Sequence, residues 1–184
     1  MIYGVNPDMA VFAKTISNGF PMGAIIGTAS TMEAAQKSFI SSAYWTEGVG
    51  PAASVACIEK MKKNYIPSHL NTIGKHFQLK WKEIGKRYDI PVFSKGRPEL
   101  VQIGFNHPEA NSLMTLFTTR MLDEGFLATS GFNPTWAHQK RHVDDYFDKA
   151  ENVFTELSES LEKKDINQKI NNSPKHTGFS RLVN

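Results

Sequence analysis

The chain has 184 residues, enough for one domain of average size or two small ones, which excludes a large multidomain machine. Its composition, with 40% hydrophobic and 21% charged residues, 13 Gly and 9 Pro, excludes disordered and collagen-like chains. The 21 basic and 18 acidic side chains give a formal charge of +3 without a sustained basic block, so a nucleic-acid-binding surface is not indicated.

Cysteine usage and hydropathy bear on the compartment. The single cysteine, Cys57, has no second cysteine for an intramolecular disulfide, and the apolar stretch 52–61 around it predicts a small buried thiol. No apolar run approaches the ~20 residues that cross a bilayer, and the first eight residues lack the features of a secretory signal. We therefore predict a cytoplasmic protein without membrane contact.

Two short apolar runs come first along the chain. Residues 9–16 are apolar up to Lys14 and are bounded by turn-forming residues, and 24–28 form a second such run. Short apolar runs between turn signals predict buried strands of an α/β sheet. Ser30 and Glu33 then have the spacing of a capping box, which predicts a short helix.

Two further helices follow a loop-like segment. The polar and aromatic residues 41–51 indicate a loop that leads into a helix ending near residue 63. From Pro67 on, apolar residues recur at steps of three and four, which is typical of an amphipathic helix packed on a core. These residues are Leu70, Ile73, Phe77, Trp81, Ile84 and Tyr88. The break between the two helices predicts a boundary between two domains, 1–66 and 67–184.

After its first helix, the second predicted domain continues with a strand, a helix, a loop with an irregular strand and a last helix. Residues 99–105 alternate enough for a half-buried strand, and the helix after them is expected to end at Gly125 with a left-handed cap. Residues 126–138 predict a loop with an irregular strand, and 143–161 carry the apolar face of the last clear helix. The polar residues 163–184 predict a tail that is loosely packed or meets a partner.

Lys14 is the first candidate for chemistry, because it ends the first predicted strand directly before the turn 17–23. An amine held near low-dielectric surroundings has a depressed pKa and can act as a nucleophile or a base. The alternative is a strand-end lysine that extends its ammonium group into water. Position alone leaves both interpretations open.

The residues around Lys14 resemble a known family. Segments 6–14 (NPDMAVFAK) and 17–24 (SNGFPMGA) are similar in order and spacing to the lysine segment of class III, pyridoxal-phosphate-dependent aminotransferases. The similarity is greatest to the glutamate-1-semialdehyde aminomutase-like branch. It implies the C-terminal part of the α/β fold type I transferase fold, with the end of the large cofactor-binding domain in 1–66 and the small α+β domain in 67–184.

The resemblance also implies a mechanism. Lys14 is expected to hold pyridoxal phosphate as a Schiff base and to move a proton while an amino group passes between small amino and carbonyl substrates. The cofactor itself stores the electrons. Substrate identity, and the choice between aminotransferase and aminomutase, cannot be read from these residues.

A second segment supports the first. Residues 46–51 (TEGVGP) resemble the family's loop that carries a threonine to the cofactor phosphate. A hydroxyl and backbone N–H groups at the start of a helix form an anion site, whereas the alternative is a plain helix-cap threonine. The resemblance implies that Thr46 serves the cofactor of the neighbouring subunit, and hence a homodimer with shared sites. Gly50 departs from the family, because many relatives have asparagine before the proline.

The remaining sequence resembles the family more loosely. Residues 131–134 with His138 are similar to the small-domain loop near the substrate entrance, and His138 is expected to order that loop. The other histidines show no ligand-type grouping, so no metal site is predicted. Trp45, next to Thr46, is the one tryptophan expected to line a site.

Several of the family's cofactor-binding groups precede the lysine, whereas thirteen residues precede Lys14 here. We therefore expect the C-terminal part of a longer enzyme, reaching a family-like end at 179–182 and marginally stable by itself. A partner segment would supply the acidic partner of the pyridine nitrogen, the glycine-containing phosphate loop and the aromatic residue over the ring. The alternative is a catalytically inactive remnant that acts only as an association module.

Overall fold

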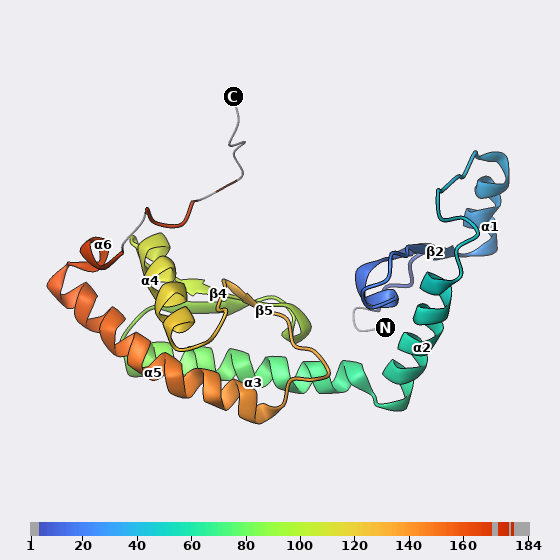
Figure 1. The fold of residues 1–184 in the computed structure, drawn as a ribbon. Helices are drawn as coiled ribbons and strands as arrows, with labels where there is room; N and C mark the ends of the chain where they lie inside the picture. The colour runs from blue at the N-terminus through green and yellow to red at the C-terminus, as the bar shows by residue number, and fades with distance from the viewer. Residues whose placement is uncertain (1–3, 171–172, 177, 179–184) are drawn as a thin grey trace. The chain divides into compact units, whose positions relative to one another are not determined.

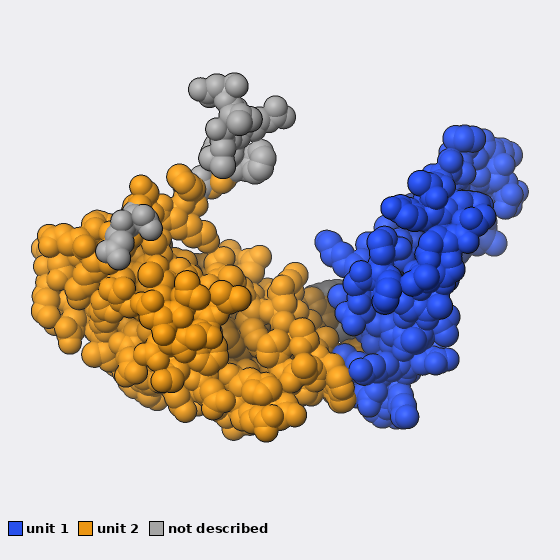
Figure 2. All heavy atoms as spheres, viewed as in Figure 1, with its two compact units in different colours: residues 1–66 blue, residues 67–184 orange. Residues whose placement is uncertain are grey.

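The computed structural model describes residues 4–170, 173–176 and 178. The chain divides into two compact units, residues 1–66 and 67–184, which are coloured separately in Figure 2. Both units combine helices with an antiparallel sheet, as Figure 1 shows. The helices of the described residues lack the combination of length and apolar character that a membrane span requires.

Unit 1 contains a two-stranded ribbon and a longer helix. Its elements are β1 (Met9–Phe12), the 3-10 helix η1 (Lys14–Ile16), β2 (Ala24–Gly27), α1 (Ala29–Met32), the 3-10 helix η2 (Glu33–Lys37) and α2 (Val49–Lys63). Strands β1 and β2 pair antiparallel, with Met9 opposite Gly27 and Phe12 opposite Ala24. The connection between them is the turn that carries Lys14.

The ribbon of β1 and β2 is exposed, so the prediction of two buried strands is wrong. Val11 is 70% exposed and Ile25 57% exposed. Side chains alternate between the two faces of a strand, which places Met9, Val11 and Ile25 on one face and Phe12 and Ile26 on the other. Apolar residues on both faces are typical of a strand inside a layered α/β sheet, but the described residues of unit 1 leave both faces open.

The predicted capping box is not formed. Ser30 lies inside α1, and Thr28 takes the N-cap position, where its hydroxyl contacts the hydroxyls of Ser30 and Thr31 at 3.2 and 2.9 Å. The α-helix then gives way to the 3-10 helix at Glu33. Because Ser30 lies two residues after the N-cap Thr28, it cannot cap the helix, and the Ser–Glu spacing was misleading here.

Unit 2 is built around an antiparallel three-stranded sheet. Its elements are α3 (Ile66–Arg87), β3 (Val92–Lys95), the 3-10 helix η3 (Pro98–Leu100), β4 (Val101–Phe105), α4 (Ala110–Asp123), β5 (Gly131–Phe132), α5 (Lys140–Lys163) and α6 (Ile166–Lys169). The strand order is β3-β4-β5, with Val92 opposite Phe105 and Val101 opposite Phe132.

The core of unit 2 is aromatic and centres on Trp81 of α3. The Trp81 ring is fully buried, with centroids 5.3 to 5.7 Å from those of Phe105, Phe117 and Phe154. Its indole N–H donates to the carbonyl of Phe93 at 3.0 Å, so the polar end of the ring is satisfied. Full burial of each such side chain stabilises the fold by about 1.5 to 3 kcal/mol. The predicted role of Trp81 as a packing residue is confirmed.

The end of unit 2 packs better than predicted. Gly125 has φ +88° after α4, which confirms its predicted left-handed cap. Within the predicted loose tail, however, Ile166 is 1% exposed and belongs to the core, and the backbone N–H of Lys175 donates to the Thr115 hydroxyl at 2.8 Å. Residues 179–182, the predicted family-like end, lie outside the described residues.

Candidate functional site

The segment 14–22, here called the lysine turn, has an unusual backbone. Lys14 and Asn18 have φ values of +56° and +47°, although neither is glycine, and Gly19 has φ +108°. The left-handed conformation costs an L-residue about 1 to 2 kcal/mol and persists where the surroundings enforce it. Such residues cluster at functional sites, so the strain directs attention to the same lysine as the sequence does.

Hydrogen bonds within the lysine turn hold this backbone in place. The carbonyl of Lys14 accepts from the N–H groups of Ser17 and Asn18. Ser17 is 2% exposed, and its hydroxyl donates to the carbonyl of Phe20. The backbone N–H of Phe20 donates in turn to the carbonyl of Ser17. The Ser-Asn-Gly sequence suits this geometry because serine closes local turns and asparagine and glycine tolerate positive φ.

The side chain of Lys14 is exposed, which corrects the expected low-dielectric surroundings. It lines an open hollow of about 490 Å³ together with residues 15 and 18–22. Its amine makes no hydrogen bond or ion pair with any residue that the structure describes. The Lys14 side chain is exposed because β1, which ends at Phe12, is not covered by other described residues of unit 1.

Thr46 lies on the exposed turn before α2, and it does not cap that helix. Gly48 takes the N-cap position, and the carboxylate of Glu47 accepts from the N–H groups of Val49 and Gly50, the latter at 3.0 Å. The helix-cap interpretation of Thr46 is therefore wrong. Sequence reasoning missed the role of Glu47, although an acidic residue just before a first turn favours that position.

The Glu47 carboxylate also changes the expected anion site. Two N–H groups at the start of α2 are already satisfied, so a phosphate group at this end would compete with Glu47 for them. The Thr46 hydroxyl is exposed and has no hydrogen-bond partner within the described part of the chain. Thr46 thus remains available to a ligand as a single donor.

The lysine turn packs directly on α2. Gly50 is buried, and a Cβ atom there would lie 3.0 Å from the carbonyl oxygen of Pro21 and 3.2 Å from the Cβ of Met22. About two helical turns further along the same face, the Cys57 thiol donates to the carbonyl of Thr15 at 3.2 Å. The close approach gives a physical reason for glycine at position 50, and the predicted buried thiol is in fact half-buried and hydrogen-bonded.

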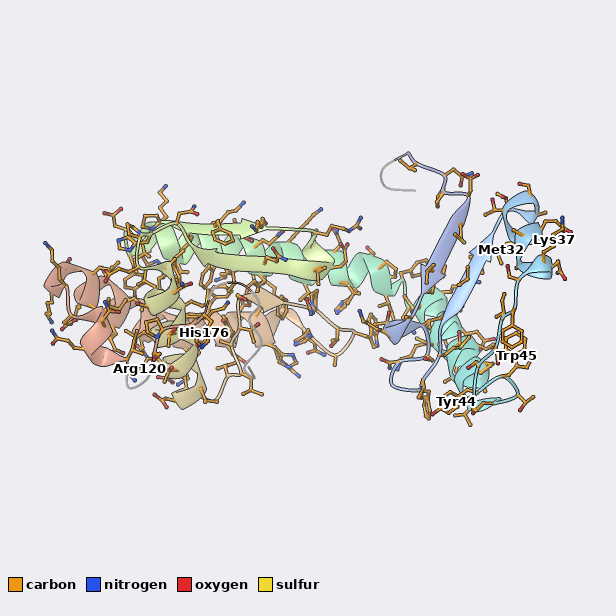
Figure 3. The ribbon with its side chains drawn as sticks, turned by 90° about the horizontal axis from the view of Figure 1, so that it is seen from above. Met32, Lys37, Tyr44, Trp45, Arg120 and His176 are labelled. Carbon is orange, nitrogen blue, oxygen red and sulfur yellow. The ribbon has the colours of Figure 1, made fainter. Side chains whose placement is uncertain are left out.

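The structure does not bring Lys14 and Thr46 into one pocket. Thr46 is not among the residues that line the hollow at Lys14. Tyr44 and Trp45, labelled in Figure 3, are 67% and 68% exposed and do not line that hollow either. The role of Trp45 at a site stays a prediction.

In unit 2, His138 orders the loop before α5, as predicted. Its Nδ1 accepts from the N–H of Thr135 at 2.9 Å, and its carbonyl accepts from Nε2 of His69 at 2.8 Å. Burial, followed by the nearby His142 and His69, lowers the pKa of His138, which favours the neutral ring that this acceptor role requires. His76 is paired with Asp144 at 2.6 Å. No group of three or more potential metal ligands occurs among the described residues.

The cofactor implied by the sequence needs an amine for its aldehyde and donors for its phosphate. Lys14 presents an exposed amine without an ion pair, and Thr46 presents an exposed hydroxyl without a hydrogen bond within the described residues. These donor groups suit an aldehyde and a phosphate ester, so the residues present fit pyridoxal phosphate.

Comparison with known proteins gives the family. The sequence model described as Aminotransferase class-III matches residues 1–154. The 3-aminobutyryl-CoA aminotransferase of Cloacimonas acidaminovorans is 27% identical over 125 residues, covering 66% of this chain and 30% of that protein. The glutamate-1-semialdehyde 2,1-aminomutase of Methylacidiphilum infernorum is 28% identical over 163 residues, covering 78% of this chain and 37% of that protein.

The fold agrees with the sequence match. The FumI protein of Sphingopyxis sp. MTA144, solved in a form that holds pyridoxal phosphate, has a TM-score of 0.78 at 18% identity over 86% of this chain and 39% of that protein. The expected α/β transaminase fold is therefore confirmed. The chain spans about a third of the length of the two curated relatives. Because the family's sequence model covers most of the chain, the chain belongs to the class III aminotransferase family.

Proposed function

We propose that the chain supplies the lysine-bearing segment and the small domain of a pyridoxal-phosphate-dependent class III enzyme. Residues 1–66 would form the C-terminal part of the large domain and 67–184 the small domain, in agreement with the two compact units. The activity is transfer of an amino group between small amino and carbonyl substrates, or within one substrate as in the aminomutase branch. The observation that carries the proposal is the exposed Lys14 amine on a strained turn inside the segment matched by the family.

Lys14 has two tasks in this proposal. Its amine attaches the cofactor through the aldehyde, and after its release it carries a proton between the substrate carbon and the cofactor. Pyridoxal phosphate, when bound, supplies the electron-accepting ring. A cover over the hollow would exclude water from the reacting amine. Since the hollow is open in this chain, we propose that the cover comes from a further polypeptide segment.

That further segment also has to supply the groups that hold the cofactor ring. The chain spans 30% and 37% of the two relatives described above. We propose that Thr46 donates to the phosphate of a cofactor held by a neighbouring subunit of a homodimer. Its exposure outside the Lys14 hollow supports this arrangement. The single thiol of Cys57 favours a reducing, cytoplasmic location.

Covalent labelling tests the lysine assignment. The full chain is incubated with pyridoxal phosphate and treated with borohydride, and the modified lysines are mapped by peptide mass spectrometry. We expect the adduct to concentrate on Lys14, to vanish from that peptide in Lys14→Ala, and to persist in Lys37→Ala, a matched exposed lysine of unit 1 shown in Figure 3. Labelling spread evenly over the lysines would contradict the proposal.

A second function is favoured by the exposed ribbon, namely association with a class III enzyme without catalysis. Val11 and Ile25 are exposed on a face without polar residues, which is the composition of a contact surface. The two functions differ in one measurement. In an assembly with a full-length class III enzyme, a purely associating chain shows no adduct on Lys14, whereas a catalytic chain does.

A further inference from the structure

The buried residues of α2 are its small ones, and they lie on one face. Gly50, Ser54 and Cys57 are spaced by four and three residues, which places them on the same side of the helix. Gly50 is buried, Ser54 is 5% exposed and Cys57 is half-buried, whereas Val55 is 58% exposed. This face of α2, with Gly50, Ser54 and Cys57, therefore packs against the rest of unit 1, whereas Val55 points outward.

Both ends of the lysine turn contact this face. At one end the backbone of Pro21 approaches Gly50, where a Cβ would be only 3.0 Å from the carbonyl oxygen. At the other end the Cys57 thiol donates to the carbonyl of Thr15, the residue after Lys14. The peptide group between Thr15 and Ile16, within η1, is thus tied to the helix by a side chain distant in sequence.

The tie acts on the strained part of the turn. Lys14 has φ +56°, and its carbonyl accepts from the N–H groups of Ser17 and Asn18. Rotation of the Thr15 carbonyl away from α2 would turn the neighbouring Lys14 peptide and loosen those bonds. Because a left-handed lysine relaxes when its surroundings permit, a contact at the next residue controls where its amine points.

We propose that Cys57 is a positioning residue for Lys14. Its thiol fixes the Thr15 carbonyl on α2, while Gly50 admits the other end of the turn, and together they keep the Lys14 amine at the hollow. This role rests on the proposed function of Lys14, but the conformational part stands on the geometry alone. A thiol that fills space without donating would not have this effect, which defines the test.

Amide hydrogen exchange in the full chain, without cofactor, tests the tie directly. In Cys57→Ala we expect exchange at the N–H groups of Ser17 and Asn18 to become about two- to tenfold faster, the range expected for loss of one hydrogen bond. Cys57→Ser restores a donor and should return both rates to the wild-type values. Val55→Ala, on the exposed side of α2, should leave them unchanged.

Two outcomes would overturn the proposal. Unchanged exchange at Ser17 and Asn18 in Cys57→Ala would show that the thiol does not hold the turn. A Cys57→Ser variant that behaves like Cys57→Ala would assign the effect to packing of the sulfur. Exchange at Ile58, within α2 itself, serves as a control for general destabilisation of the helix.

Labelling with pyridoxal phosphate and borohydride separates this proposal from the proposed function. We expect the yield on Lys14, relative to Lys37, to fall by a similar factor in Cys57→Ala and to recover in Cys57→Ser. If wild-type Lys14 is not labelled while the exchange rates respond as expected, the proposed function is wrong, but the Cys57 hydrogen bond still holds the lysine turn. If Lys14 is labelled equally in all variants, Cys57 does not position it.

Discussion

His138 illustrates how a loop fixes the charge state of one side chain. Its Nδ1 accepts from a backbone N–H, and its ring is packed at 5.2 Å from that of Phe132. The acceptor role of Nδ1 requires the neutral ring, and burial lowers the pKa of His138 in the folded chain. The proton affinity of this residue is therefore lower folded than unfolded.

This difference predicts a pH dependence of stability. The unfolded histidine binds a proton below about pH 6.5, whereas the folded one resists protonation, so unfolding takes up a proton. The stabilisation is complete above pH 6.5 and is lost as the pH falls through the lowered pKa of His138. We expect the free energy of unfolding of unit 2, from urea titration, to fall between pH 7.5 and 5.5.

His138→Gln is the matched control, because an amide oxygen can accept from Thr135 without titrating. Its free energy of unfolding should depend less on pH over the same interval. Equal slopes for the two proteins would show that His138 does not carry the effect. Asp144 and Glu156 also have lowered pKa values, but carboxylates titrate below this interval.

Sequence reasoning found some side chains of the site and missed others. Lys14 and Thr46 were identified through the motif, because their types and spacing are characteristic of the family. The role of Glu47 was missed although its hydrogen bonds are local, and the contact of Cys57 was missed because it depends on where the lysine turn lies against α2. The positive φ of Lys14 has no signal in its residue type, as lysine rarely adopts it.

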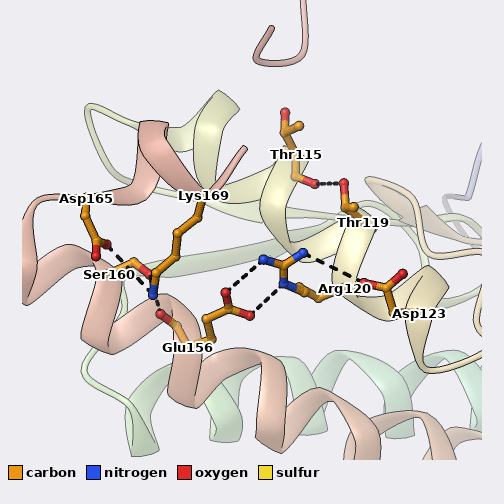
Figure 4. A network of polar contacts seen from close by, with 8 residues as sticks. All are labelled: Thr115, Thr119, Arg120, Asp123, Glu156, Ser160, Asp165 and Lys169. Carbon is orange, nitrogen blue, oxygen red and sulfur yellow. Dashed lines mark hydrogen bonds and ion pairs between the residues drawn. The ribbon is translucent and has the colours of Figure 1, made fainter. Parts of the chain in front are cut away.

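Helices α4 and α5 are joined by a polar network shown in Figure 4. Arg120 donates through two nitrogens to both carboxylate oxygens of Glu156, at 2.8 and 3.0 Å, and lies 3.8 Å from Asp123. The two side chains of the pair are 29% and 28% exposed. This geometry lowers the pKa of Glu156 through its hydrogen bonds with Arg120 and distinguishes the pair from a surface ion pair.

We expect Arg120→Lys to destabilise unit 2 by about 1 to 2 kcal/mol, because lysine keeps the charge but loses the two-pronged hydrogen bond. Chemical denaturation measures the change. As a control, Lys163→Ala removes the exposed pair with Glu159 and should have no measurable effect. A lysine at 120 that is as stable as arginine would show that charge alone carries the contact.

The long helices and several of the strands were predictable, whereas β3 and α6 were not. Helices α3 and α5 follow a clear apolar period over 22 and 24 residues, and their buried faces are the predicted ones. Strand β3 has four residues, and its existence depends on pairing with β4, so it leaves little local pattern in the sequence. Helix α6 has four residues and is anchored by Ile166 alone among buried residues.

The two units differ in how many buried hydrophobic side chains they contain. Among the described residues, every buried hydrophobic side chain except Ile66 belongs to unit 2. Length and composition alone did not reveal this asymmetry, because apolar residues occur throughout the chain.

Separate expression of the units tests this asymmetry. We expect residues 67–184 alone to unfold in one cooperative transition by circular dichroism, since their aromatic core is self-contained. Residues 1–66 alone should bind a hydrophobic dye and lack a cooperative transition, because their apolar faces find no cover. A cooperative transition in 1–66 would show that unit 1 needs no partner surface.

The open ribbon has a thermodynamic consequence. A polypeptide surface that covered Val11 and Ile25 would bind the folded form of unit 1 but not the unfolded chain. By mass action, the stability of unit 1 then rises with the logarithm of the concentration of that surface. Under the proposed function, folding of the lysine turn and assembly of the site would become one equilibrium, and the concentration of the partner would set the fraction of chains with an assembled site.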